Sequence, residues 1–226
     1  MGAVPVSGGH NIGGVHFLLN GDEAGRATVL LAHGAGAAMD TAFMAAIAEG
    51  LAARGLRVAR FEFAYMAARR TGGPKRPPPK IEVLQEEYLK AADALACEGP
   101  LIIGGKSMGG RVASLIADDL CARGRISGLL CLGYPFHPQG KPEKLRTAHL
   151  AALSVPALIC QGSRDPFGTR EEVAGYGLSQ SITLKWLEDG DHDLKPRKRV
   201  TGRSHEEHLA ATCDAVAAWS AAELPG

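Results

Sequence analysis

A serine flanked by closely spaced glycines stands near the middle of the chain. Ser107 is the centre of the sequence Gly-Lys-Ser-Met-Gly at residues 105–109. A serine hydroxyl is a weak nucleophile at neutral pH, and it needs a neighbouring base and N–H groups that stabilise the oxyanion formed during attack. Glycines two residues before and after the serine let a strand and a helix approach closely at a sharp turn that exposes the hydroxyl. We therefore predict that Ser107 is a nucleophile.

The same residues also match the end of a phosphate-binding loop, which has the pattern G-x-x-x-x-G-K-[ST]. The first glycine of that pattern would fall on Pro100, and Gly99 is one residue too early. Residues 101–103 favour a strand rather than a loop, and no apolar strand ends in an aspartate suited to magnesium. The nucleotide-binding interpretation of this segment is therefore the weaker one.

An acid and a base follow Ser107 in the order expected for an activated serine. Asp165 lies just beyond the apolar run 157–161, and His192 lies in a loop after the run 182–187. A histidine can take the serine proton, and a carboxylate can fix the tautomer of that histidine. The alternatives are a turn-forming aspartate that caps a helix and a surface histidine in an acidic turn. Asp189, Asp191 and Asp193 are alternatives for orienting His192. Because such near neighbours in sequence rarely point at the same imidazole nitrogen, we expect Asp165 to orient it.

A glycine-rich turn, His-Gly-Ala-Gly-Ala at residues 33–37, follows another buried strand. Such a turn can present backbone N–H groups to an oxyanion. We expect the N–H groups of Met108 and of Ala35 or Gly36 to form this oxyanion hole. His33 is expected to brace the turn rather than to transfer a proton.

The other histidines and the cysteines give no sign of a metal site. The histidines, which lack paired ligand spacing, are His10, His16, His137, His149, His205 and His208. We expect His205 and His208 to be solvated on a helix. The five cysteines are dispersed without C-x-x-C spacing, as is typical of buried reduced thiols in a cytoplasmic protein. We therefore predict no metal and no cofactor.

Basic residues flank the predicted site in sequence. They are Arg69, Arg70, Lys75, Arg76, Lys106, Arg111, Lys195, Arg197, Lys198 and Arg199. Loops that follow parallel strands share one edge of a sheet, so these charges could surround a pocket and favour a carboxylate- or phosphate-bearing substrate. The alternative is a solvated basic surface. The residues we consider as substrate-binding candidates are His33, Arg69, Arg70, Lys106 and Lys195.

Short apolar runs alternate with helical patterns along the chain. Strands are predicted at residues 15–20 (an edge strand), 27–32, 56–63, 101–104, 126–132, 157–161 and 182–187. Helices are predicted at residues 41–53, 81–97, 112–123, 143–153 and 204–222. Residues 67–80 are too rich in proline and glycine for a helix or an interior strand. This alternation indicates a mostly parallel sheet with helices on both faces, a three-layer α/β/α sandwich in a single domain spanning residues 1–226.

Length and charge narrow the function classes. The chain has 226 residues, 46% of them hydrophobic, and a formal net charge of +1, which suits one α/β domain. The near-neutral charge gives no general attraction to nucleic acid or to a membrane surface. No apolar stretch approaches the roughly 20 residues that span a bilayer, and the first residues do not resemble a secretory signal. We therefore expect a cytoplasmic protein.

The combination of HGAGA, GKSMGG, QGSRDPFG and DGDHDLK resembles the α/β-hydrolase superfamily over nearly the whole chain. Within it the sequence resembles a compact bacterial branch, related to the hydrolase-like domain of a testis-expressed protein and of a histone-acetyltransferase complex subunit. The resemblance implies a sheet of about eight strands and a triad of Ser107, Asp165 and His192. The chain is also similar in size to dienelactone hydrolases, but those have cysteine at the position of Ser107. Residues 134–153 are too short for a large lid, which argues against a large lipid substrate.

These features predict a serine hydrolase that cleaves a small ester or thioester through an acyl-enzyme. A catalytically silent hydrolase fold that acts as a binding scaffold is the alternative from another class, and peptidase or amidase action is a third. The expected partner is a small acyl substrate, and the oligomeric state is left open.

Overall fold

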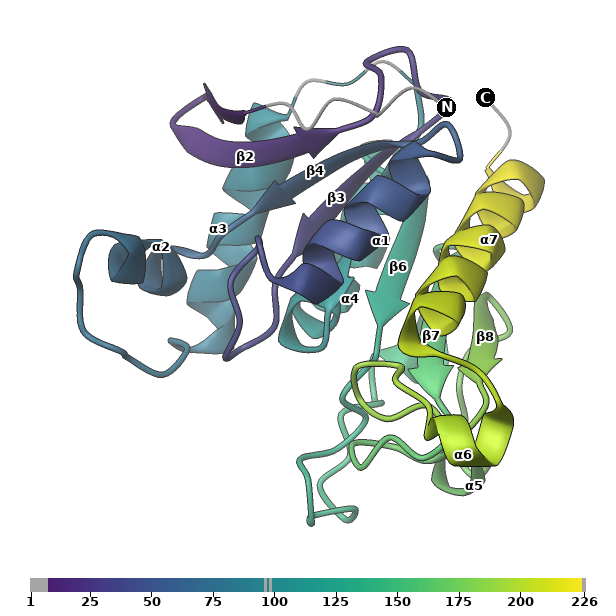
Figure 1. Cartoon of the computed structure of the whole chain (residues 1–226). Coiled ribbons are helices and arrows are strands. Elements are labelled where there is room, and N and C mark those ends of the chain that lie inside the picture. The colour runs from purple at the N-terminus through teal and green to yellow at the C-terminus, as the bar shows by residue number, and fades with distance from the viewer. Residues whose placement is uncertain (1–7, 96, 98, 225–226) are drawn as a thin grey trace.

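An eight-stranded sheet forms the middle layer of the computed structural model, which describes residues 8–95, 97 and 99–224 (Figure 1). Its strands are β1 (Gly9–Ile12), β2 (Val15–Asn20), β3 (Thr28–Ala32), β4 (Arg57–Phe61), β5 (Leu101–Lys106), β6 (Gly128–Leu132), β7 (Ala157–Gly162) and β8 (Ile182–Leu187). Their order in the sheet is β1-β2-β4-β3-β5-β6-β7-β8. All pairs from β4 to β8 are parallel, and β2 runs antiparallel to both of its neighbours. The prediction of a mostly parallel sheet is confirmed.

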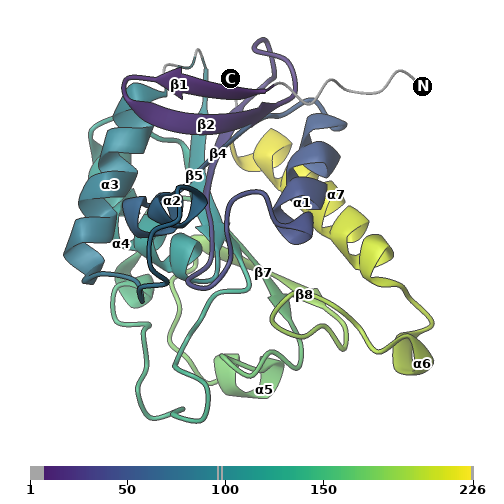
Figure 2. The same cartoon turned by 60° about the vertical axis from the view of Figure 1, so that its left-hand side comes forward.

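Two pairs of long helices cover the two faces of this sheet. Figure 2 shows α3 (Ile81–Ala94) and α4 (Met108–Ala122) on one side, and α1 (Ala42–Ala52) and α7 (His205–Glu223) on the other. Shorter helical segments lie in the connections: α2 (Ala64–Arg70), η1 (Leu150–Ala152), α5 (Arg170–Val173) and α6 (Lys198–Thr201). The three-layer α/β/α arrangement is therefore also confirmed.

The sheet has a separate apolar core on each face, because successive side chains of a strand point to opposite sides. Leu30 of β3 packs into the core under α3 and α4, and Leu31 packs into the core under α1 and α7. All five residues of β3 are buried, as are those of β4, β5, β6 and β7. This explains why β3, β6 and most of β5 and β7 are continuous apolar runs rather than alternating ones, whereas β4 also buries Arg57 and Arg60.

The edge of the sheet differs from the prediction. Residues 15–20 are not at the edge, because β1 precedes them and pairs with β2 in an antiparallel hairpin. The segment Gly-His-Asn-Ile of β1 is largely exposed and has no apolar alternation, so its pattern did not indicate a strand.

The connection after β4 also differs. The expectation that residues 67–80 hold no helix is wrong at its start, because α2 extends to Arg70. Good helix formers (Ala, Met and Arg) fill α2, and the glycines and prolines begin only at Gly72. The described residues after that position form no helix or strand up to α3.

A helix predicted at residues 143–153 is reduced to the single 3₁₀ turn η1. The backbone N–H of Arg146 donates to the carbonyl of Phe136 at 2.7 Å instead of to a carbonyl within its own segment. The connection between β6 and β7 therefore extends as a loop beyond the sheet (Figure 1). No large lid is present among the described residues, as predicted.

Three further predictions concern the end of a helix, the exposure of a histidine and the first residues of the chain. The helix expected at residues 81–97 ends at Ala94, and residue 96 lies outside the described residues. His208 is buried rather than solvated, and its Nδ1 lies 2.9 Å from the carbonyl oxygen of Leu194. The segment 1–7, on which the prediction about a secretory signal depends, also lies outside the described residues.

Within the described ranges, no helix has both the length and the apolar character needed to cross a bilayer.

Candidate active site

Ser107 occupies the turn between β5 and α4, at the carboxyl edge of the sheet. Its backbone has φ 50° and ψ −112°, a left-handed conformation that a residue with a side chain rarely adopts. The Ser107 N–H donates to the carbonyl of Leu132 at 3.0 Å, and the Ser107 carbonyl accepts from the N–H of Arg111 at 3.0 Å. The strained turn is thus fastened to both β6 and α4.

The glycines around Ser107 are required by close packing. A Cβ atom on Gly105 or on Gly109 would collide with the carbonyl oxygen of Ala32 at the end of β3. The spacing that marked Ser107 in the sequence therefore has a steric cause, because α4 starts against the neighbouring strand.

His192 lies beside Ser107 on the loop after β8. Its Nε2 is 2.9 Å from the Ser107 Oγ, and its Nδ1 is 2.8 Å from the Asp165 Oδ2. The half-buried ring packs against Phe167, with ring centroids 4.4 Å apart. The structure therefore brings together the three residues singled out in the sequence, in one line of hydrogen bonds.

The carboxylate of Asp165 is fully buried and is held by several donors. Besides His192, the Gln161 Nε2 donates to its Oδ2 at 2.9 Å, and the Phe167 N–H donates to its Oδ1 at 2.9 Å. A buried carboxylate requires such partners, because its desolvation is costly. These bonds fix the orientation of the oxygen that faces His192.

Gln161 is a site residue that the sequence reasoning missed. Its side chain is also fully buried, and its Oε1 accepts from the Tyr134 N–H at 2.7 Å while its Nε2 donates to Asp165. Gln161 therefore connects the ends of β6 and β7 to the carboxylate. A polar residue inside the apolar run of β7, four positions before Asp165, was the available signal.

The turn at residues 33–37 is braced from two sides. The His33 Nε2 accepts from the N–H of Phe63 at 3.2 Å, and its Nδ1 donates to the carbonyl of Gly34 at 2.7 Å. Burial lowers the pKa of His33, which agrees with a neutral ring that carries its one proton on Nδ1. From the other side, the hydroxyl of Tyr65 donates to the carbonyl of Ala35 at 2.8 Å. Tyr65 was not anticipated, whereas the bracing position of His33 was.

The braced turn lies over Ser107. A Cβ atom on Gly34 would be 3.8 Å from the Ser107 Cβ. Three backbone N–H groups, those of Met108, Ala35 and Gly36, lie in or next to this region. Within the described part of the chain, none of them donates to a backbone carbonyl in a turn, loop or helix cap. Free N–H groups beside a nucleophile are what an oxyanion hole needs.

A pocket of about 510 Å³ opens at Ser107 and His192. Its lining consists of Gly34, Ala35, Gly36, Ala37, Thr41, Ala42, Phe43, Met44, Lys106, Ser107, Phe167, His192 and Asp193. Most of these side chains are apolar or absent, and the turn at 33–37 and the start of α1 form one wall. The pocket can therefore receive a small apolar group next to Ser107.

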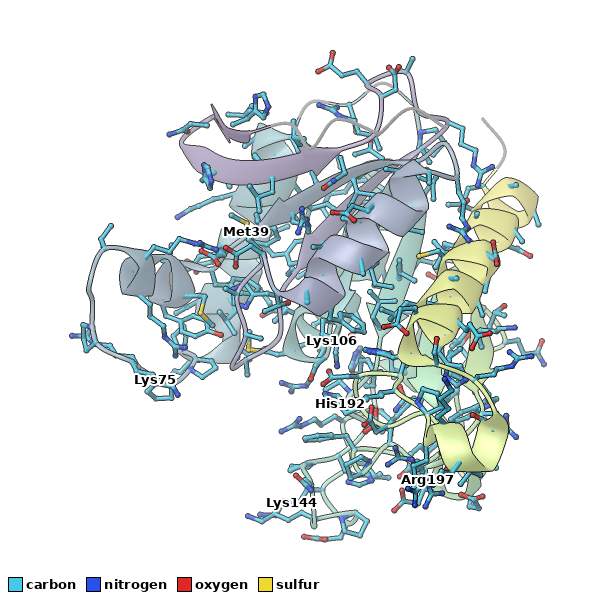
Figure 3. The ribbon with its side chains drawn as sticks, viewed as in Figure 1. Met39, Lys75, Lys106, Lys144, His192 and Arg197 are labelled. Atoms are coloured by element: carbon cyan, nitrogen blue, oxygen red, sulfur yellow. The ribbon has the colours of Figure 1, made fainter. Side chains whose placement is uncertain are left out.

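Lys106 is buried and engaged with the loop that carries His192. Its Nζ donates to the His192 carbonyl at 2.7 Å and lies 3.3 Å from a carboxylate oxygen of Asp193. Burial lowers the pKa of Lys106. Lys106 and His192 lie close together in Figure 3. Because Lys106 donates to the His192 carbonyl, it holds the loop that carries His192 in place.

The remaining basic candidates do not line this pocket. Arg70 is paired with Glu62 and Asp40, and Arg69 donates to the carbonyl of Arg76 at 2.6 Å. The exposed Lys195 is absent from the lining, as are Arg69 and Arg70.

Two more of the basic residues that flank the site in sequence also lie elsewhere. In Figure 3, Lys75 and Arg197 lie well away from His192. Arg197 pairs with Asp189, and this pairing lowers the pKa of Asp189 to about 2. The expected ring of charges around the pocket is therefore not formed by these residues.

Within the described ranges, no group of three or more His, Cys, Asp or Glu side chains is arranged to hold a metal ion. All five cysteines are unpaired, and Cys131, Cys160 and Cys213 are buried in the two cores.

Comparisons with known proteins agree with this fold. A family model described as an alpha/beta hydrolase domain matches residues 25–221. A dienelactone hydrolase from Anabaena variabilis is similar in structure, with a TM-score of 0.68, 19% identity, and coverage of 99% of this chain and 100% of that chain. A serine hydrolase involved in carbazole degradation has a TM-score of 0.68 at 15% identity, covering 96% of this chain and 99% of that one. A serine hydrolase without a lid from Xanthomonas campestris has a TM-score of 0.65 at 16% identity, covering 100% of this chain and 99% of that one.

Proposed function

The chain belongs to the alpha/beta hydrolase domain family, and we propose that it is a serine hydrolase that cleaves a small ester or thioester through an acyl-enzyme. The observation that carries this proposal is the line of hydrogen bonds from the Ser107 hydroxyl through His192 to the buried Asp165, at the mouth of a pocket. The serine hydrolases among the structural neighbours support the hydrolytic class.

In the proposed reaction, the Ser107 Oγ attacks the carbonyl carbon of the substrate while the His192 Nε2 takes the hydroxyl proton. Asp165 holds the His192 ring in the tautomer with its proton on Nδ1 and stabilises the imidazolium that forms. The N–H groups of Met108 and of Ala35 or Gly36 stabilise the tetrahedral oxyanion. His192 then gives its proton to the leaving alcohol or thiol, and the acyl group stays on Ser107.

Water completes the cycle by the same route in reverse. His192 takes a proton from a water molecule, and the hydroxide attacks the acyl carbon bound to Ser107. Collapse of the second tetrahedral intermediate releases the carboxylic acid and returns the proton to the Ser107 Oγ. The apolar lining of the pocket favours a short uncharged group on one side of the scissile bond.

Hydrolysis of a neutral chromogenic ester such as p-nitrophenyl acetate tests this function. We expect kcat to fall by about 10⁴-fold or more in Ser107→Ala and in His192→Gln, because residues of such a triad act as one unit. Ser127→Ala is the matched control, since Ser127 stands before β6 at the opposite edge of the sheet. Turnover that is absent from the native chain would favour a binding scaffold. Turnover that is unaffected by Ser107→Ala would contradict Ser107 as the nucleophile.

A further inference from the structure

Two arginines, Arg111 and Arg146, lie near one another beside the proposed nucleophile, and we refer to them as the arginine pair. Arg111 is one helical turn beyond Ser107 in α4, and its N–H donates to the Ser107 carbonyl at 3.0 Å. Helical side chains lean toward the N-terminus of their helix. The guanidinium of Arg111 therefore extends toward the edge of the sheet where Ser107 lies.

The loop between β6 and β7 brings Arg146 to the same place. The Tyr134 hydroxyl donates to the carbonyl of Arg146 at 2.9 Å and lies 3.4 Å from the Nε2 of His149. That Nε2 is 2.8 Å from the Ser114 Oγ, which donates to the carbonyl of Arg111 at 2.8 Å. A chain of hydrogen bonds thus fastens the backbones of the arginine pair to one another.

The charges of the arginine pair are not neutralised within the described part of the chain. Other arginines have carboxylate partners: Arg54, Arg57, Arg70, Arg123, Arg125, Arg164, Arg170 and Arg197. Neither arginine of the pair has an ion pair there, and the buried Nε of Arg111 has no hydrogen-bond partner. Arg60 and Arg69 also have a buried Nε without a partner, but their other nitrogens donate to Met39, Asn20 and Arg76. Burial and the charge of Arg111 lower the pKa of Arg146, so the two guanidinium groups are close enough to repel.

Within the described part of the chain, neither Asp118 nor His149 forms an ion pair with the arginine pair. Asp118 is the acid near His149, but its carboxylate accepts from the N–H groups of Ser154 and Val155. Burial and the nearby Arg111 lower the pKa of His149, which leaves this ring neutral at about pH 7. Two half-buried cations without an acid are costly, and a bound anion would remove that cost.

The arginine pair and the apolar pocket lie on opposite sides of Ser107. The pocket is walled by the start of α1, which covers one face of the sheet. Arg111 belongs to α4, which covers the other face. Neither arginine of the pair is part of the pocket lining, so a substrate whose scissile bond lies at Ser107 must extend away from that pocket to reach them.

We propose that the arginine pair binds a carboxylate or phosphate group on the substrate arm opposite the apolar pocket. This inference rests on the proposed function, because it places the scissile bond at Ser107. Guanidinium groups suit both oxyanions, since their planar N–H donors bind two oxygens at once. The preferred substrate is thus a small ester or thioester with one apolar arm and one anionic arm.

Binding to the Ser107→Ala variant tests this inference without turnover. Isothermal titration calorimetry compares monomethyl glutarate, which carries one carboxylate, with the neutral dimethyl glutarate. We expect tighter binding of the monoester, and a fall of about 10-fold or more in its affinity after Arg146→Gln, as for a lost charge-assisted hydrogen bond. Competition by inorganic phosphate against acetate shows which oxyanion is preferred.

Arg123→Gln is the matched control, because Arg123 follows the far end of α4 and pairs with Asp119 on the surface. It should leave the preference for the monoester unchanged, whereas Arg111→Gln should reduce it as Arg146→Gln does. Arg146 lies in a loop, so its variant remains informative if Arg111→Gln fails to fold.

Equal affinity for the two esters, no binding of either, or a preference that survives Arg146→Gln would overturn the inference. The hydrolysis of neutral p-nitrophenyl acetate separates this outcome from failure of the proposed function. If p-nitrophenyl acetate is hydrolysed but the monoester is not bound more tightly than the diester, only the role of the arginine pair is contradicted. If the monoester is bound more tightly but p-nitrophenyl acetate is not hydrolysed, only the proposed hydrolase activity is contradicted.

Discussion

The buried carboxylate of Asp165 acts on the chemistry only through His192, and this predicts a specific defect. In Asp165→Asn the amide remains close in shape, but its NH₂ group competes to donate to the His192 Nδ1 and favours the wrong tautomer. We expect kcat for p-nitrophenyl acetate to fall by about 10⁴-fold with KM nearly unchanged. A melting temperature close to that of the native chain serves as the control for folding. A loss of less than about 10-fold would mean that Asp165 does not set the tautomer.

The hydroxyl of Tyr65 holds the turn that carries the proposed oxyanion donors. Tyr65→Phe removes its bond to the Ala35 carbonyl and keeps the ring. We expect kcat to fall about 5- to 10-fold without a matching rise in KM. The lost hydrogen bond is worth roughly 1 kcal/mol, and it positions N–H groups that stabilise the transition state rather than the bound substrate. Tyr176→Phe is the control, since no hydrogen bond of its hydroxyl occurs within the described ranges. An unchanged kcat in Tyr65→Phe would contradict this role.

The positions of Ser107, Asp165 and His192 could be predicted because each lies at or shortly after the end of an apolar strand. Tyr65 and Gln161 could not, since their roles depend on partners that only the fold brings near. Tyr65 contacts Ala35 across 30 residues of sequence, and Gln161 contacts Tyr134 across 27. The interpretation of Arg69, Arg70 and Lys195 as substrate-binding residues has a related weakness. The sequence shows which residues carry charge, but it does not show which of these charges have partners.

At the scale of elements, the approach of α4 to β3 depends on the missing side chain of Gly109. A Cβ in Gly109→Ala would collide with the Ala32 backbone and move the start of α4 away from the sheet. We expect a loss of about 3 kcal/mol in the free energy of unfolding, measured by urea denaturation. Gly177→Ala is the matched control, because a Cβ there meets no atom within 4 Å. Equal stability of the two variants would show that the turn has room to adjust.

Long elements with strong patterns were predicted closely, and short ones were not. The helix expected at residues 41–53 is α1 (Ala42–Ala52), and that at 204–222 is α7 (His205–Glu223). A buried apolar stripe or a capping box marks each of them. By contrast, β1, α2, α5 and α6 were not predicted, because segments of four to seven residues are too short to show a clear hydrophobic period, although α5 also begins with a capping box.

At the scale of the whole molecule, the buried His33 and the half-buried His149 predict how stability depends on pH. Burial lowers the pKa of His33 and of His149 below the ordinary value of 6.5. The unfolded chain therefore binds more protons than the folded chain as pH falls below that value. This contribution to stability is fully present above about pH 6.5 and is lost as pH falls through the window below it.

Urea unfolding at a series of pH values between about 5 and 7.5 measures this effect. The free energy of unfolding should fall toward the acid end, and His33→Gln should reduce the slope, because glutamine can bond to the Phe63 N–H without titrating. A slope that is unchanged by His33→Gln would contradict the assignment to this residue.

The central claim is that Ser107 is an activated nucleophile, and covalent labelling tests it most directly. A fluorophosphonate probe reacts with such a serine, and intact-protein mass spectrometry followed by peptide mapping locates the adduct. We predict one adduct on the native chain, located at Ser107, absent from Ser107→Ala, strongly slowed in His192→Gln and retained in Ser127→Ala. A native chain that forms no adduct, or an adduct that persists in Ser107→Ala, would contradict the claim.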